Sequence, residues 1–330
     1  MKKIIFLFIL SLVFVGCKKA MIDKKLATND RYANFDYLWE QVDKKYSYFD
    51  VKNIDWNQIR TTYRAQIDPN MNDVAFFNLL KNMLNELKDD HTNLISPFDV
   101  SLYNFGSNYV PQFYEPLLDD LFPDIMRTGA FQHSMVPNEN IGYIRMPSFG
   151  NSFSEATLDW ILGNYMQTQG LIIDVRGNGG GYANSVGILL ARFTNTKILA
   201  GYQQMRNGEA HSDFSAPSAI YISPAGNYYS KPVIVLTDGG SYSATTFFAL
   251  CSKAFPNMRT LGEPTGGGGG LPNGGQLPNG WNYRFSITRL LDVNQQNYAE
   301  SGVPADIPVA FNTSDLTQDE LINAAIQALQ

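Results

Sequence analysis

The chain has 330 residues, a formal net charge of −6 and a hydrophobic content of 44%. That length can hold a large core, organised as one medium domain and a smaller one. The acidic balance, without a dense cluster of lysine and arginine, argues against nucleic acid as a partner. No repeat of fixed length is visible in the sequence, which argues against a solenoid.

The first 17 residues are typical of a bacterial lipoprotein signal peptide. Two lysines precede an apolar run from Ile4 to Val15, which is too short to span a bilayer, and Gly16 stands before Cys17. The pattern predicts a membrane anchor on an acylated Cys17, in the cell envelope and facing the periplasm, with inner and outer membrane both open. Because Phe14 is unusual three residues before such a cysteine, secretion with another cleavage site remains the alternative.

If Cys17 is acylated, Cys251 is the one cysteine left in the mature sequence. That excludes an intrachain disulfide. Cys251 has the spacing of a buried helical residue, so we expect it to pack in the core.

Large side chains at helical spacing begin after a polar tether at residues 18–30. Three stripes at 35–42, 56–63 and 76–87 predict an N-terminal helical bundle over residues 31–99. His91 follows the third stripe, where a histidine commonly acts as a favourable charge at the end of a helix. Histidine is scarce in this chain, so a catalytic role for His91 stays open. The next segment, 100–138, lacks a period and is expected to be a connecting loop region.

Strands and helices alternate over residues 139–330, which predicts an α/β core. The segment holding His211 is expected to be a polar loop. Residues 266–280 are dominated by glycine, asparagine and proline, which indicates a loop over the site or a plain linker. The expected strands are 140–149, 171–175, 233–236 and 283–291, and the expected helices are 154–166, 184–193, 243–255 and a last one after Thr317.

A glycine-rich loop, 176–181, directly follows the expected strand at 171–175. It lacks the lysine and hydroxyl pair of a phosphate-binding loop, and its spacing does not fit a dinucleotide fingerprint. The sequence therefore predicts neither a nucleotide nor another cofactor, and no metal site. The remaining interpretation is a nest of backbone amides for an oxyanion.

Ser243 stands where the strand at 233–236 passes through a glycine turn into a helix. Its hydroxyl is expected at the positive end of that helix, beside the free amide of Ala244. A serine in this position often only caps its helix. The two glycine loops, however, bring exposed amides to the same edge of the sheet, and this favours a nucleophile.

The motifs GYIRMPSF, LIIDVRGNGGG, TDGGSYSATTFFA, LGEPTGGG and ESGVPADI occur in this order, after a helical leader that ends in DDHT. Together they resemble the tail-specific or C-terminal-processing serine peptidases, the family that includes the tricorn core protease. The resemblance covers most of residues 32–329. It implies a crotonase-like (ClpP/crotonase) α/β core, a serine nucleophile and cleavage of peptide bonds.

Two departures from the family decide the branch. No lysine follows Lys253, which excludes a serine–lysine dyad, and the space before Ile141 is too short for a PDZ module of about 100 residues. The tricorn-like branch fits better, and the resemblance implies that His91 is the base, Ser243 the nucleophile and Glu300 the supporting acid.

The same comparison implies an oxyanion hole of backbone amides. We expect the amides of Gly180 and Ala244 to form it, with Gly179 as the close second. Asp90 stands where the tricorn protease has a serine and is expected to support the site. A neutral serine needs a base near neutral pH, and with lysine excluded histidine supplies it; a carboxylate then holds the imidazole, directly or through another polar side chain.

Other polar residues have structural interpretations. Without the resemblance, Glu300 could be a surface acid. His133 and His211 are expected in surface or hydrogen-bonding roles, and Asp174 is expected to be a structural carboxylate beside Arg176.

The sequence thus predicts a lipid-anchored serine endopeptidase acting on peptides or unfolded protein tails, of open oligomeric state. The alternative is a non-catalytic binding lipoprotein, because the interphotoreceptor retinoid-binding proteins resemble the same core without being peptidases.

Overall fold

The computed structural model describes residues 28–103, 109–298 and 300–330. The signal sequence, Cys17 and most of the tether lie outside the described residues. Within the described part, no helix combines the length and the hydrophobicity needed to cross a membrane.

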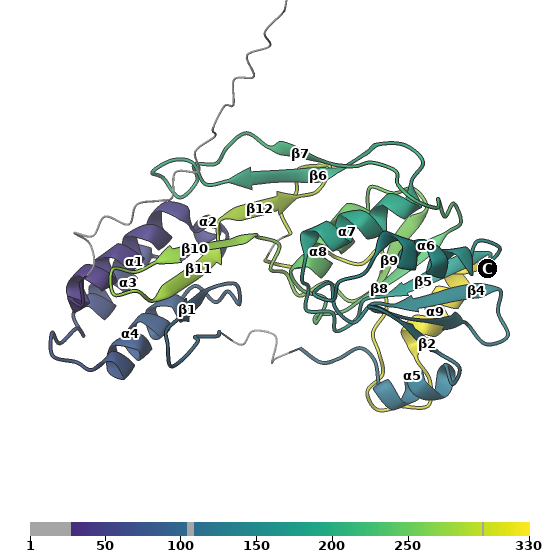
Figure 1. The fold of residues 1–330 in the computed structure, drawn as a ribbon, viewed down its shortest axis with the longest axis horizontal. Helices are drawn as coiled ribbons and strands as arrows, with labels where there is room; N and C mark the ends of the chain where they lie inside the picture. The colour runs from purple at the N-terminus through teal and green to yellow at the C-terminus, as the bar shows by residue number, and fades with distance from the viewer. Residues whose placement is uncertain (1–27, 104–108, 299) are drawn as a thin grey trace, which may run out of the picture.

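Mixed α/β structure fills the described residues (Figure 1). The helices are α1 (Arg31–Lys45), α2 (Phe49–Lys52), α3 (Trp56–Arg64), α4 (Asp73–Asn85), α5 (Glu115–Leu121), α6 (Glu155–Gly163), α7 (Ala183–Leu190) with the 3-10 turn η3 (Ala191–Phe193), α8 (Ala244–Ser252) and α9 (Glu320–Leu329). The strands are β1 (Asn93–Ile95), β2 (Met126–Thr128), β3 (Phe131–Met135), β4 (Ile141–Arg145), β5 (Gly170–Asp174), β6 (Ile198–Met205), β7 (Ser218–Ile222), β8 (Val233–Thr237), β9 (Met258–Gly262), β10 (Pro272–Gln276), β11 (Asn282–Ser286), β12 (Thr288–Leu291) and β13 (Ile307–Pro308).

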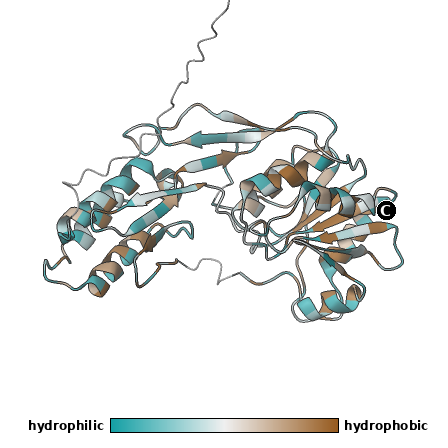
Figure 2. Cartoon of the chain, viewed as in Figure 1, coloured by the Kyte–Doolittle hydropathy of each residue, from teal (hydrophilic) through white to brown (hydrophobic). Residues whose placement is uncertain are grey.

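A seven-stranded sheet in the order β13-β9-β8-β5-β4-β3-β2 forms the centre of the larger lobe. Its middle strands β4, β5, β8 and β9 are parallel. β4, β5 and β8 are buried along their whole length. Successive side chains of a strand point to opposite sides, so these strands are covered on both faces. Ile173 and Val235 face the layer that holds α6, α7 and α8, whereas Ile172 and Ile234 face the layer that holds α5 and α9. Figure 2 shows hydrophobic residues concentrated along these strands.

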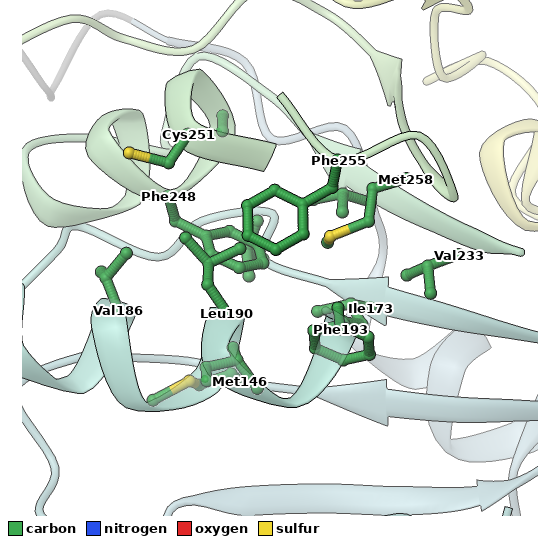
Figure 3. Packing of buried hydrophobic residues seen from close by; sticks show 14 of the residues in the cluster. Met146, Ile173, Val186, Leu190, Phe193, Val233, Phe248, Cys251, Phe255 and Met258 are labelled. Carbon is green, nitrogen blue, oxygen red and sulfur yellow. The ribbon is translucent and has the colours of Figure 1, made fainter. Parts of the chain in front are cut away.

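The packing between α7 and α8 anchors the helix that begins beside Ser243. Phe248 and Cys251 of α8 lie against Val186 and Leu190 of α7 in one cluster (Figure 3). Cys251 is fully buried, in agreement with the expected core position. Because this layer is close-packed, the start of α8 has little freedom to move.

The N-terminal helices are not a self-contained bundle. Their apolar faces share a second core with Trp281, Tyr283 and Phe285 of the β10–β11 hairpin, which pairs through β11 with β1. The hairpin lies beside α1 and α4 in Figure 1. Residues 272–286, expected to be part of the α/β core, therefore complete the N-terminal lobe instead.

Three other expectations need correction. The segment 100–138 is not only loop, because it contains α5 and the antiparallel strands β2 and β3. The expected polar loop region holding His211 contains the hairpin strands β6 and β7, and His211 itself lies in the connection between them. The expected strand at 283–291 is two strands, β11 and β12, which separate at Ile287 and join different sheets. The strands β2, β3, β6 and β7 are short or half-exposed, so they lack the apolar alternation by which a strand is recognised.

A buried arginine fastens α9 to the sheet. Arg176, with no exposed side-chain surface, pairs with Asp174 at 2.6 Å and with Asp319 at 2.9 Å. Tyr143 also donates to Asp174. Asp174 is thus the structural carboxylate that the sequence indicated.

Replacing Arg176 by methionine should destabilise the protein by about 3–5 kcal/mol, because two buried carboxylates lose their partner. Urea unfolding at pH 7 measures the change. Arg259→Met, on an exposed position of β9, is the control and should change stability by less than about 0.5 kcal/mol. An equal, small effect of both substitutions would contradict the buried network.

Candidate active site

Ser243 occupies the turn from β8 into α8 with a backbone conformation that is rare for a residue with a side chain. Its φ is 57° and its ψ is −116°. Such a conformation costs about 1–3 kcal/mol and persists only where the surroundings enforce it. The serine side chain makes no capping hydrogen bond. The capping interpretation is therefore wrong, and the hydroxyl is free to face another partner.

Buried polar groups enforce this turn. The backbone N–H of Ser243 donates to the Gly267 carbonyl at 3.0 Å. Before it, Asp238 accepts hydrogen bonds from the amides of Gly177 at 2.9 Å and Gly240 at 3.0 Å, and Ser241 Oγ donates to Val175 O at 2.8 Å. The two glycine loops that follow β5 and β8 are thereby tied together.

His91 reaches this turn from the N-terminal lobe. Its Nε2 lies 2.9 Å from Ser243 Oγ, a hydrogen bond between residues 152 positions apart in the chain. The imidazole is 7% exposed and lies next to the Tyr242 ring, with centroids 5.3 Å apart. Burial lowers the pKa of His91, and the nearby Asp89 carboxylate opposes that shift. A neutral imidazole beside a serine hydroxyl can accept its proton.

A cavity of about 570 Å³ opens over the pair and is lined by both side chains. Gly179 and Ala244 beside the serine are part of its wall. The apolar lining comes from both lobes and includes Ile220, Phe247, Leu271, Pro272 and Leu290.

The amides beside Ser243 partly differ from the expected set. The Gly180 amide donates to Asn178 Oδ1 at 2.9 Å, and Gly180 does not line the cavity. Gly179 and Ala244 do line it, and within the described residues neither amide donates a hydrogen bond. The geometry therefore favours Gly179 over Gly180 as the partner of Ala244, because a donor already bonded is not free for an oxyanion.

Glu300 lies away from the imidazole. Its Oε2 pairs with Lys52 Nζ at 2.5 Å, and among the described residues no hydrogen bond joins it to His91. Burial raises the pKa of Glu300 to about 7, although Lys52 opposes the shift. Lys52 also donates to the carbonyls of Leu87 at 2.9 Å and Lys88 at 2.7 Å. Glu300 is thus linked, through Lys52, to the turn that carries His91.

One acid and two histidines complete the comparison with the sequence. Asp90 lines the cavity over Ser243 and also a neighbouring cavity of about 580 Å³ that contains Lys52 and Glu300. His133 is fully buried and is hydrogen-bonded to Thr128 and Tyr165. Of its two expected roles, the structure shows the hydrogen-bonding one and not the surface one. His211 pairs with Asp43 at 2.8 Å. No group of three or more His, Cys, Asp or Glu side chains within the described ranges could hold a metal ion.

Lys52 and Asp89 were missed by the sequence reasoning. Asp89 accepts the backbone N–H of His91 at 2.8 Å, and an aspartate two residues before the donor is a recognisable turn signal. Lys52 has no such signal, because it lies 39 residues before His91 and in a separate helix.

An imidazole within hydrogen-bond reach of a serine at a strand–helix turn is the arrangement of serine hydrolases. Residues 140–309 match the model of Peptidase family S41, and residues 27–85 match that of the Tricorn protease C1 domain. Because the first match spans more than half of the chain, the chain belongs to Peptidase family S41, a family of serine peptidases. The resemblance seen in the motifs is confirmed by both matches.

Individual relatives agree with this assignment. The carboxy-terminal processing protease CtpB of Bacillus subtilis (strain 168) is 27% identical over 188 residues, which cover 56% of this chain and 37% of that protein. The chain thus matches little more than a third of that relative's length.

A crystal structure of a Parabacteroides merdae ATCC 43184 protein assigned to the peptidases is 37% identical, with a TM-score of 0.85 over 92% of this chain and 97% of that one. The crystal structure of mature CPAF shares the fold at 12% identity, with a TM-score of 0.67 over 91% and 96% of the two chains.

Gly180→Ala should destabilise the protein by about 1–3 kcal/mol. An added Cβ would lie 2.7 Å from Tyr242 O and 2.8 Å from Ser243 Cβ, and the φ of Gly180 is +100°. Gly179→Ala is the matched control for folding, since a Cβ there meets no atom within 4 Å. Thermal unfolding of both variants is the measurement. Equal stability of the two would contradict this tight packing behind the turn.

Proposed function

We propose that this protein is a serine endopeptidase that hydrolyses peptides or unfolded protein tails. The observation that carries the proposal is the 2.9 Å contact between His91 Nε2 and Ser243 Oγ. This contact places a neutral, buried imidazole within hydrogen-bond reach of the serine hydroxyl, and a serine nucleophile needs such an adjacent base.

The reaction follows from the positions of these groups. Ser243 Oγ attacks the carbonyl carbon of the peptide bond, and His91 Nε2 takes the hydroxyl proton. His91 then gives that proton to the leaving amine, which leaves the acyl group on Ser243 Oγ. In the second half of the reaction His91 takes a proton from water, the water oxygen attacks the acyl carbon, and the proton returns to Ser243 Oγ as the acid product leaves. The amides of Ala244 and Gly179 are placed to donate to the oxyanion that forms between these steps.

Glu300 has a supporting role in this proposal. It does not touch His91, but its carboxylate binds the Lys52 ammonium, which in turn binds the carbonyls of Leu87 and Lys88. In this way Glu300 steadies the turn that presents His91. Asp90 lines both the cavity that contains Glu300 and the cavity over Ser243.

The larger lobe is proposed to be a crotonase-like core, with the N-terminal helices as an attached subdomain. Support comes from the parallel strands β4, β5, β8 and β9 with α6, α7 and α8 on one face. Both loops that surround Ser243 follow strands of that sheet. The site lies where the helical lobe closes against this core, so both lobes are needed for activity.

Substrates are proposed to place an apolar side chain beside the cleaved bond. The cavity over Ser243 has room for such a group, and Ile220, Phe247 and Leu290 contribute apolar wall. Processing of protein tails is suggested by the relative CtpB, which is a carboxy-terminal processing protease.

The location of the enzyme is proposed from its first 17 residues. A lipid on Cys17 would hold the catalytic lobes at a membrane of the bacterial envelope, on the periplasmic side. The tether at residues 18–30 would leave the active site free to meet peptides.

Purified protein should react with a fluorophosphonate probe, because Ser243 is an activated nucleophile. Ser243→Ala should abolish the labelling, and His91→Ala should slow it by at least about a hundredfold, the scale of general-base catalysis. In-gel fluorescence against time is the measurement.

His211→Ala serves as the control, since His211 contacts Asp43 and Phe49 and not the serine. It should label at the rate of the unchanged protein. If the folded, unchanged protein fails to label, the peptidase proposal is overturned, and a binding protein on the same fold becomes the better account.

Cys17→Ser should abolish incorporation of radiolabelled palmitate in bacterial cells and release the protein from the membrane fraction. The matched substitution Cys251→Ser, at a buried thiol, should leave the incorporated label per folded molecule unchanged. Palmitate labelling of the Cys17→Ser variant would rule out the proposed anchor.

A further inference from the structure

The turn that presents His91 is built around Asp89. Lys88 has a φ of 49°, which reverses the chain after α4. Asp89 Oδ1 then accepts the backbone N–H of His91 at 2.8 Å, and the Asp89 carbonyl accepts that of Thr92 at 2.9 Å. Asp89 is 3% exposed. One buried carboxylate therefore fixes the backbone on which the imidazole depends.

Buried polar atoms lie on both sides of this bond. Asp89 Oδ2 and His91 Nδ1 are buried and make no hydrogen bond of good geometry within the described residues, although the buried Tyr46 hydroxyl interacts with the Asp89 carboxylate and the Gly270 backbone interacts with the imidazole. A carboxylate buried among few polar groups has a large electrostatic effect on nearby ionisable groups, because the surroundings screen it poorly.

The charged and titratable groups that face His91 come from three elements. Asp89 and Asp90 belong to its own turn, Arg284 comes from β11, and Tyr242 comes from the turn before α8. Glu300 forms its ion pair with Lys52 and not with His91. Asp89 is therefore the buried acid whose carboxylate is hydrogen-bonded to the backbone of the base.

We propose that Asp89 is the positioning residue of the active site, which holds His91 through its backbone and supplies the negative charge that stabilises the imidazolium. This is the role that the family resemblance gave to Glu300. The inference rests on the proposed function, because an imidazolium forms only if His91 takes the proton of Ser243.

Electrostatics support the same assignment. Burial lowers the pKa of His91, and the Asp89 charge raises it more than any other neighbour does. Arg284 lowers it, and a backbone hydrogen bond with Gly270 and the charge of Asp90 make smaller contributions that raise it. When catalysis places a proton on His91, the cost of a buried positive charge is reduced mainly by Asp89.

The test replaces Asp89 by asparagine, whose side-chain oxygen can still accept the His91 N–H but carries no charge. NMR titration of the three histidines, assigned by single His substitutions, reports the pKa of His91 directly. We expect that pKa to fall by about one unit or more, the effect of removing an opposite charge at short range. The rate of fluorophosphonate labelling at pH 7 should fall about tenfold or more.

Two control variants test whether the pKa change is specific to Asp89. Glu300→Gln and Asp90→Asn each remove a charge from the same region, and each should lower the pKa of His91 by less than Asp89→Asn does. If Asp89→Asn leaves the pKa of His91 unchanged, or Glu300→Gln lowers it as much or more, the inference is overturned.

A second variant guards against failure to fold. Asp89→Ser also offers an oxygen to the His91 N–H without charge, and it should shift the pKa in the same direction. If neither variant folds, Asp89 serves folding and not the base, which also overturns the inference. Suppose that Asp89→Asn lowers the pKa of His91 as expected, but the unchanged protein is never labelled by the fluorophosphonate. The proposed peptidase activity then fails, while the coupling of Asp89 to His91 stands.

Discussion

The hydrogen bond between His91 and Ser243 depends on the packing of two lobes, because each lobe supplies one of its partners. Contacts between the lobes are therefore part of the active site. Tyr48 donates to Thr288 O at 2.9 Å, and Arg289 donates to Ser47 O at 2.8 Å. These bonds join the N-terminal helices to β12. A displacement of about 1 Å between the lobes would remove the serine from reach of its base.

Strain at Ser243 is compatible with a stable fold because its neighbours hold the turn from several sides. Gly267 accepts the Ser243 N–H at 3.0 Å and also the Thr246 hydroxyl at 2.6 Å. The glycine-rich segment that follows β9 is thus bonded to the nucleophile turn, and it continues into β10, which packs with the N-terminal helices. It is neither a plain linker nor a detached flap. One segment fixes the serine and connects it to the lobe that carries the histidine.

The sequence was informative where a residue's role depends on its local pattern. Apolar runs predicted β5 and β8, and the glycine turn located Ser243. It failed where a role depends on a distant partner. Whether Gly180 or Gly179 has a free amide is decided by Asn178, which takes the Gly180 N–H. The partner of Glu300 is decided by Lys52, nearly 250 positions away. The β10–β11 hairpin was placed in the wrong lobe because its aromatic residues become apolar core only against α1 and α4.

Burial shifts the pKa values of His91 and Glu300 in opposite directions. The pKa of His91 is lowered by burial, so the stability gained from its neutral form is present above pH 6.5 and is lost as the pH falls through the lowered value. The pKa of Glu300 is raised to about 7, so the stability gained from its neutral form is full below pH 4.5 and is lost as the pH rises through about 7. The charge of the imidazolium therefore arises only during the reaction, while the Glu300 carboxylate stays paired with the Lys52 ammonium. A fixed carboxylate next to that imidazolium then stabilises the transition state more than the ground state, which is the condition for catalysis by charge.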